Sequence, residues 1–383
     1  MMISEEILLD IQPHVITQSD RTGFPIFSKP LAHGGFSLSP DGKFEKNSNR
    51  LRYLVVPQMG KIQLHLGDSE AKCPRKFNLL QPSLDNILLF MECNGTNFLN
   101  AKDRLNTQVD YDIVCSSEVL ELILRTPYEM EESWTLAVSK YRNTIYISPV
   151  VLTEPKTSPM KEMKAEWIEK LRRHFLSENE HTLPEPRDPR EPTGQYNGVF
   201  SFSINGKRFI FDAPVLAECA IPKKPNDVNT MPESNYIFTE LQIRPDNMSV
   251  DEWTTHNRSE ALKWWIKCFI VGIQNVHVAY VNSHIIAHTI KKVSARQIWK
   301  DCDKVWSPHV CVNFLARLVD QIRCFMSPVD CHRTVYLLTF DATQGKISYK
   351  SYPGRSQFTF IPDWFRIMLD ERKQDLFATA IGL

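Results

Sequence analysis

Residues 236–243 read YIFTELQI, and residues 259–273 read SEALKWWIKCFIVGI. The first stretch is rich in β-branched and aromatic side chains, which is typical of a strand. The second is an almost unbroken apolar run that stops at Gly272, and glycine commonly follows the last turn of a helix. We therefore expect a strand followed by a helix, with the acidic side chain of Glu240 on the strand.

Strand-like and helix-like segments alternate irregularly along the rest of the chain. Short extended pieces precede residue 66, and Asn205-Gly206 joins two strand-like stretches with the dipeptide most characteristic of a two-residue hairpin. Further strands are expected at 144–148 and 276–290, and helices after Ser83, over 117–124 and 160–175, from Ser307-Pro308 and after Pro362. Irregular alternation favours mixed sheets over a doubly wound parallel sheet. The sequence thus predicts an α/β (α+β mixed) fold, with helices flanking mixed β-sheets, in a single large domain over residues 1–383.

A proline-rich stretch interrupts this pattern at residues 182–194, which read TLPEPRDPREPTG. Four prolines in thirteen positions exclude a helix or a central strand, because proline has no backbone N–H and its ring clashes with the preceding helical turn. We expect this stretch to be an exposed connector within the domain.

The composition limits the possible partners and compartments. Lys+Arg and Asp+Glu both number 45, so the chain has no overall basic field and any RNA contact must come from a local patch. The nine cysteines form no CxxC pair, and the start MMISEEILLD lacks the order of a secretory signal, so a reducing compartment is expected. No apolar run approaches the roughly 18 residues of a membrane helix. We expect a soluble protein of the cytosol or nucleus that does not bind a membrane.

The chain contains none of the strong catalytic motifs. GxGxxG, P-loop, GxSxG, HExxH and paired-cysteine zinc patterns are all absent from the sequence. His284 and His288 have the spacing of a helical zinc pair, but their segment, VAYVNSHIIAHTI, alternates as a strand does. We therefore interpret the two histidines as strand residues and not as metal ligands.

Three stretches together carry a resemblance that covers nearly the whole chain. YIFTELQI and the KWW helix after it look like a strand ending in Glu-hydrophobic-Lys and a KLLKWW helix, and GGFSLSPDGKF with LRYL is similar to a G-x-F-S-L…LRYY entry. A TPYE motif is matched by RTPYE, and the W-x-L-A stretch that comes after that motif is matched by WTLAVSKYRNTIYIS. The match is completed by PHVCVNFLARLVDQI and FTFIPDWF. In this order and at these intervals, the chain resembles the DXO family of decapping exoribonucleases.

The family is known for hydrolysing RNA 5′ ends, including triphosphate, defective-cap and NAD-cap ends, and some members are 5′-to-3′ exonucleases. This chemistry uses Mg²⁺ or Mn²⁺ held by clustered carboxylates. Several acidic side chains must converge to neutralise two divalent cations, so that one metal activates water and both stabilise the phosphoryl transition state.

The sequence departs from the family at the positions of this chemistry. The family's arginine site corresponds to Ser117, and its Gly-hydrophobic-x-hydrophobic-Glu motif ends at Phe202. Its Glu-hydrophobic-Asp motif corresponds to Pro214 and Leu216. Its Glu-hydrophobic-Lys motif corresponds to Glu240 and Gln242. Only Glu240 keeps a family carboxylate. The resemblance therefore implies a vestigial pocket with no catalytic residue, no metal ligand set and no cofactor, in which the ring of Phe202 fills space that phosphate and metals would need.

Two other hypotheses about the same pocket remain open. Asp212 and Glu218 share strand parity with the lost carboxylates and could rebuild a weak metal site with Glu240, although a displacement of roughly 6.6 Å along a strand exceeds a Mg–O bond of about 2.0–2.1 Å. Such a residual hydrolase would depend on Glu240. A pure RNA 5′-end binder would instead keep a basic pocket, for which Lys263 and Lys267 are candidates.

The resemblance is strongest to a degenerate germline branch of the family in flies, and it implies an interaction protein. The expected setting is the nucleus, on heterochromatic piRNA source loci, in a complex with Rhino and Deadlock. The expected role is to shield nascent transcripts from 5′-end decay, termination or processing. Direct contact with RNA 5′ ends or nascent transcripts is left open.

Overall fold

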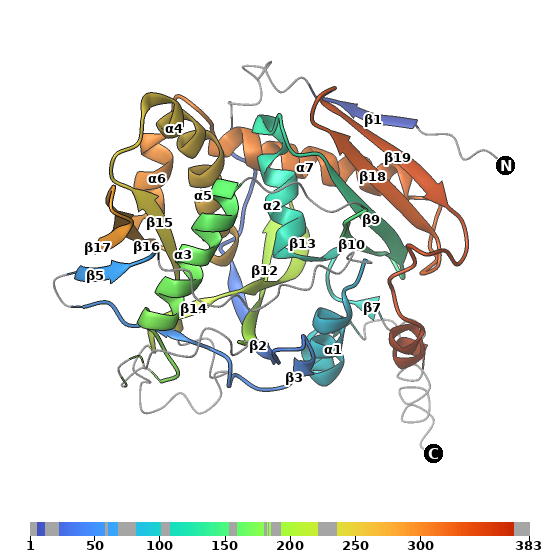
Figure 1. Ribbon diagram of the computed structural model, residues 1–383. Coiled ribbons are helices and arrows are strands. Elements are labelled where there is room, and N and C mark those ends of the chain that lie inside the picture. The colour runs from blue at the N-terminus through green and yellow to red at the C-terminus, as the bar shows by residue number, and fades with distance from the viewer. Residues whose placement is uncertain are drawn as a thin grey trace.

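Two large mixed β-sheets dominate the computed structural model (Figure 1). The structure describes residues 6–11, 23–57, 60–67, 82–100, 108–152, 159–179, 182, 184, 193–220 and 236–370. In spatial order, the first sheet consists of β1 (Glu6–Asp10), β19 (Lys346–Tyr352), β18 (Val335–Asp341), β9 (Trp134–Tyr141), β10 (Thr144–Val150), β8 (Ile113–Ser116), β13 (Lys207–Pro214), β12 (Gln195–Ile204), β2 (Leu31–Leu38) and β3 (Phe44–Glu45). Its β8 runs parallel to both neighbours, whereas the other pairs in this sheet are antiparallel.

The second sheet adjoins the first where the chain passes from β13 to β14 through Val215. Its strands, in spatial order, are β11 (Leu176–Ser177), β4 (Tyr53–Leu54), β14 (Leu216–Ala220), β15 (Tyr236–Pro245), β16 (Asn275–Val281), β17 (Ile286–Ser294) and β5 (Lys61–His65). Strand β15 is parallel to β16 and antiparallel to β14. A separate pair joins β6 (Leu99–Asn100) to β7 (Gln108–Val109). The expectation of mixed sheets is confirmed.

Helices pack on and between the sheets, and α3 crosses in front of the second sheet in Figure 1. They are α1 (Asp85–Cys93), α2 (Ser117–Arg125), α3 (Pro159–Phe175), α4 (Val250–Thr255), α5 (Ala261–Val271), α6 (Ala295–Asp301) and α7 (Pro308–Phe325), with a further helix over 363–370. A π-helical turn, His256–Glu260, leads from α4 into α5, and short 3₁₀ turns lie at Gly95–Asn97 and Thr126–Tyr128. None of the helices in the described part of the chain is long and apolar enough to cross a membrane.

Helix α5 forms part of a core shared by both sheets. Most of its side chains are buried, because its apolar residues surround the helix instead of following one stripe. Trp265 packs on Trp306 with ring centroids 5.4 Å apart, and Gly272 ends the helix at φ 85° while its N–H bonds Cys268 O. A left-handed residue at this place favours glycine, which has no Cβ to clash. The predicted end of the helix is confirmed.

The hairpin between β12 and β13 also forms as the sequence predicts. Asn205 and Gly206 have φ of 48° and 79°, and Ile204 pairs directly with Lys207 across the turn. Positive φ at both central residues gives a turn whose twist matches that of the strands, which is why Asn-Gly is favoured there.

Two other sequence expectations have different outcomes. His288 lies on β17, where its Nε2 is 2.5 Å from Asp246 Oδ2, and His284 lies in the turn before it, so the strand interpretation holds for His288 alone. The proline-rich connector at 182–194 lies outside the described residues, apart from Thr182, Pro184, Thr193 and Gly194.

Candidate functional site

Two adjoining cavities lie where the chain passes from one sheet to the other. The first, of about 250 Å³, is the basic cavity, and its charged lining residues are Arg50, Arg52, Arg172, Arg173, Lys267, Glu169 and Glu240. The second, of about 370 Å³, is the acidic cavity, lined by Glu118, Glu121 and Asp212 together with Ser116, Ser117 and Asn197. Gln195, Pro214 and Lys267 line both. Together the two cavities form one depression, of which one part is lined mainly by basic side chains and the other mainly by acidic ones.

Glu240 is the central charged group of the basic cavity. Its side chain is 2% exposed, and it forms an ion pair with Lys267 of α5 and a second one, 3.4 Å long, with Arg172 Nη2 of α3. The backbone N–H of Leu241 also donates to Glu240 Oε1 over 3.2 Å. Burial by itself raises the pKa of a carboxyl group, but Lys267 and Arg172 outweigh it and keep the pKa of Glu240 below its ordinary value. The carboxylate is therefore ionised and already neutralised by the protein.

The local sequence explains how α3 reaches this carboxylate. Leu241 and Ile243 of β15 share a buried cluster with Trp167 and Leu171 of α3. This packing places the helix against the strand, because apolar residues at helical spacing bury one face together. Arg172 follows Leu171 directly and so comes within reach of Glu240.

Asp212 of β13 has the opposite environment in the acidic cavity. Its Oδ2 accepts a 2.6 Å hydrogen bond from Asn197 Nδ2, and Asn197 Oδ1 accepts one from Gln195 Nε2, also over 2.6 Å. Burial raises the pKa of Asp212 to about 6, against the lowering effect of the Asn197 bond. Among the described residues, the buried Oγ of nearby Ser116 has no hydrogen-bond partner.

The structure brings four of the predicted pocket positions to the depression and leaves two away from it. Ser117 lines the acidic cavity, Leu216 and Glu240 line the basic one, and Pro214 lines both. Gln242 lies two residues beyond Glu240 on β15 and lines neither.

Phe202 is a core residue and does not reach the depression. It is 3% exposed, and its ring centroid lies 4.9 Å from that of Phe209 and 5.2 Å from that of Phe27. The expectation that its ring fills the cavity is therefore corrected. The reason is position along the strand, since Gln195 and Asn197 at the start of β12 line the depression, whereas Phe202 lies near the other end of the strand and joins the main core.

The carboxylates that could rebuild a metal site do not converge. Glu218 pairs with Lys292 Nζ at 2.5 Å and lies 4.0 Å from His277 Nε2, and it lines neither cavity. Asp212 and Glu240 line different cavities. Across the described ranges, no three His, Cys, Asp or Glu side chains are grouped so that they could hold a metal ion.

The residues of the depression do not fit the family's metal ions. Mg²⁺ requires several oxygen ligands at about 2.0–2.1 Å in octahedral geometry. Pro214 and Leu216 offer no side-chain oxygen, and the carboxylate of Glu240 is bound to two cationic side chains. A divalent ion would have to displace those cations.

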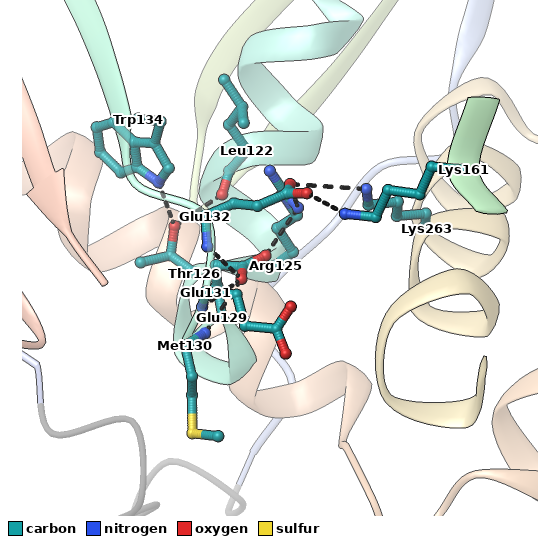
Figure 2. Close-up of polar contacts among 10 residues, drawn as sticks. All are labelled: Leu122, Arg125, Thr126, Glu129, Met130, Glu131, Glu132, Trp134, Lys161 and Lys263. Atoms are coloured by element: carbon teal, nitrogen blue, oxygen red, sulfur yellow. Dashed lines mark hydrogen bonds and ion pairs between the residues drawn. The ribbon is translucent and has the colours of Figure 1, made fainter. Parts of the chain in front are cut away.

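Lys263, a predicted RNA-binding residue, lines neither cavity and belongs to a polar network around Glu132 (Figure 2). Its Nζ lies 4.0 Å from Glu132 Oε2, and Lys161 Nζ donates to Glu132 Oε1 over 2.6 Å. Arg125 Nη1 joins Glu132 to Glu129, at 2.8 and 2.7 Å. Hydrogen bonds from Lys161 and Arg125 outweigh the effect of burial and lower the pKa of Glu132 to about 2. The network ties the end of α2 to α3 and α5.

Sequence reasoning missed the arginines of the basic cavity. Arg50 and Arg52 lie beside β4, whereas Arg172 and Arg173 lie on α3. Their separation of more than a hundred residues gives no periodic or motif signal, so only the tertiary fold brings them together.

The family described as "RAI1 like PD-(D/E)XK nuclease" matches residues 28–366. This chain belongs to that family. The predicted resemblance is thereby confirmed, since the RAI1-like family includes the decapping exoribonucleases that the chain also matches.

Among curated relatives of this RAI1-like chain is Protein cutoff of Drosophila melanogaster, 40% identical over 384 residues, which span 99% of this chain and 97% of the relative. The human decapping and exoribonuclease protein is 24% identical over 369 residues, covering 92% and 88% of the two chains. Candida albicans Rai1, solved in complex with pU5-Mn²⁺, superposes with a TM-score of 0.71 at 15% identity, over 98% of this chain and all of that one. These similarities agree with the mixed α/β fold described above.

Proposed function

We propose that this RAI1-like protein has lost RNA 5′-end hydrolysis and acts by binding. Its role would be that of a nuclear adaptor in a chromatin-associated complex that protects nascent piRNA-precursor transcripts from 5′-end decay, termination or processing. The proposed partners are Rhino and Deadlock, as the germline resemblance of the sequence implies. The similarity to Protein cutoff over nearly the full length of both chains supports this assignment.

The proposed loss of RNA hydrolysis rests mainly on one observation, the ion pairing of Glu240 with two cationic side chains. Metal-dependent phosphoryl chemistry needs carboxylates that are free to coordinate cations. Here the single retained carboxylate is paired with Lys267 and Arg172, and the neighbouring motif positions are Pro214 and Leu216. Each of these features argues independently against a two-metal site.

A second candidate function, binding of RNA 5′ ends without hydrolysis, is favoured by the basic cavity. Five basic side chains and two acidic ones line it. The buried Nε atoms of Arg50 and Arg172 have no hydrogen-bond partner within the described residues. Guanidinium N–H groups are suited to phosphate oxygens, so this cavity could hold a 5′ phosphate directly.

The deciding experiment measures release of 5′-end label from 5′-triphosphate and NAD-capped RNA in Mg²⁺ or Mn²⁺. Purified wild-type protein and Glu240→Gln are compared, with the human decapping and exoribonuclease protein as a positive control for the assay. We expect no turnover by either form of this protein. Turnover that Glu240→Gln abolishes would refute the proposed loss of chemistry and establish a residual hydrolase.

Binding experiments then separate the adaptor from the RNA-end binder. The adaptor should co-purify with Rhino and Deadlock after nuclease treatment, because its contacts are with protein. The RNA-end binder should instead bind 5′-phosphorylated oligonucleotides more tightly than 5′-hydroxyl ones, with an affinity that falls steeply with salt. Loss of that difference in Arg172→Gln would locate the end in the basic cavity.

A further inference from the structure

We infer that Lys267 and Arg172 take the place of divalent cations as built-in counter-charges of Glu240, so that the former metal site has become an internal ionic clamp between α3, α5 and β15. This inference concerns the stability and metal response of the chain itself. It holds whether or not the protein binds a partner or an RNA end.

The first step is the cost of burying Glu240. The side chain is 2% exposed, and an ionised carboxylate loses its hydration when buried, so it persists only with compensating charge or hydrogen bonds. In a metal-dependent site, divalent ions provide that charge. Here the compensation comes from a lysine and an arginine.

The second step is the origin of the two cations. Lys267 extends from α5 and is 24% exposed, whereas Arg172 extends from α3 and is 37% exposed. Two unit charges together match the charge of one divalent ion. Because they come from different helices, their bonds to one strand carboxylate hold both helices to β15.

The third step is that the position of the family motif's lysine carries no cation in this chain. The resemblance places a lysine two residues after the glutamate, where this chain has Gln242. Gln242 lines neither cavity, and the cation that binds Glu240 comes from the following helix. A lysine that bonds the carboxylate directly occupies the space in which a metal would bind it.

The fourth step is the contrast with Asp212. Its carboxyl group is paired with the neutral amide of Asn197, and burial raises its pKa. Glu240, which is more deeply buried from solvent, has a lowered pKa because its partners are cations. The difference in charge partners, and not in burial, therefore distinguishes the two carboxyl groups.

The test is a double-mutant cycle on thermal stability, with Glu240→Gln, Lys267→Met and the double variant measured in EDTA and in excess Mn²⁺. Lys267→Met should lower Tm by about 4–6 °C, because it leaves a buried carboxylate without its main partner. The double variant should recover most of that loss, because no buried charge remains. Mn²⁺ should leave the Tm of the wild type unchanged.

Lys263→Met is the matched control, since Lys263 lies one turn earlier on α5 and is 33% exposed. Its Tm should fall much less than that of Lys267→Met, because its partner Glu132 is 39% exposed and keeps its bonds to Arg125 and Lys161. If Lys267→Met alone does not fold, folding of the double variant counts as the expected recovery. Failure of both, or simple addition of the two single effects, would contradict the clamp. A Mn²⁺-dependent rise in wild-type Tm that Glu240→Gln removes would overturn the inference.

Discussion

At the scale of single residues, Asp212 and Glu240 have different ionisation behaviour although they line adjoining cavities. Cationic partners lower the pKa of Glu240, and burial with only a neutral amide partner raises that of Asp212 to about 6. A raised folded-state pKa contributes stability that is fully present below the unfolded value, near 3.8, and is lost as pH rises through about 6. Asp212 thus weakens the fold at neutral pH.

Asp212→Asn should therefore stabilise the protein at neutral and alkaline pH. Asparagine keeps an oxygen that can accept the bond from Asn197 but carries no charge to bury. We expect a gain of about 1–3 kcal/mol at pH 8 and little change at pH 4, measured by denaturant unfolding. A gain that is equal at both pH values would show that charge is not its cause.

Phe202→Ala tests whether this ring belongs to the core or to the cavity. In a closely packed aromatic cluster, the truncation should cost about 3–5 kcal/mol of unfolding free energy. Phe24→Ala is the matched control, since that ring is 40% exposed, and it should cost much less. Near-equal losses from the two variants would place Phe202 outside the core.

The same residue shows where prediction of the site from sequence ends. Glu240 and Pro214, which the family motif indicated, line the same cavity, at the junction of β13, β14 and β15. Strand β12 pairs with β13 without any shift from Asn197 to Ile204, so Phe202 lies well along the strand from Asn197, within the main core. Alternation predicts which face of a strand a side chain lies on, but how far along the strand the depression extends depends on the packing of distant elements, which no local signal marks.

At the scale of elements, the sequence predicted those helix ends and turns that depend on residues close together in the chain. The Asn205-Gly206 turn, the end of α5 at Gly272 and the apolar face of α3 all depend on neighbouring residues along the chain. The placement of β8 between β10 and β13, parallel to both, depends on distant segments. For the same reason, the arginines of the basic cavity could not be found from spacing alone.

The network around Glu132 joins α2, α3 and α5, and its contribution to stability should depend on pH. A lowered folded-state pKa gives stability that is present above the unfolded value of 4.5 and is lost as pH falls through about 2. Glu132→Gln should thus lower stability at pH 7 by about 0.5–1 kcal/mol, a modest value because the side chain is 39% exposed. The difference from the wild type should shrink as pH falls from 4.5 to 2.

Glu131→Gln is the control for this prediction, because the Glu131 side chain is exposed and its backbone N–H, which the substitution keeps, donates to Glu129 Oε1. Its stability should follow that of the wild type over the whole pH range. A loss in Glu132→Gln that persists unchanged at pH 2 would point to packing, and not to the ion pairs with Arg125 and Lys161.

At the scale of the whole molecule, the two sheets share one main core. Buried residues of β8, β12 and β13 belong to the same cluster as those of β16, and α2, α5 and α7 contribute to it from between these strands. Such a core makes the stability of each sheet depend on the other. The single domain over residues 1–383 stays a prediction, and the shared core is its physical basis.

Unfolding should accordingly be one cooperative transition. Intrinsic fluorescence reports all eight tryptophans, of which Trp134, Trp264, Trp265 and Trp306 are buried in the shared core, and far-UV circular dichroism reports the strands and helices. If the sheets cannot separate without exposing that core, both signals will change with the same midpoint in denaturant. Two separate midpoints would instead divide the chain near Val215, the residue between β13 and β14, where the polypeptide leaves one sheet for the other. In that case the cavities would lie between two folding units, and the ion pair of Glu240 with Arg172 would be a contact between those units.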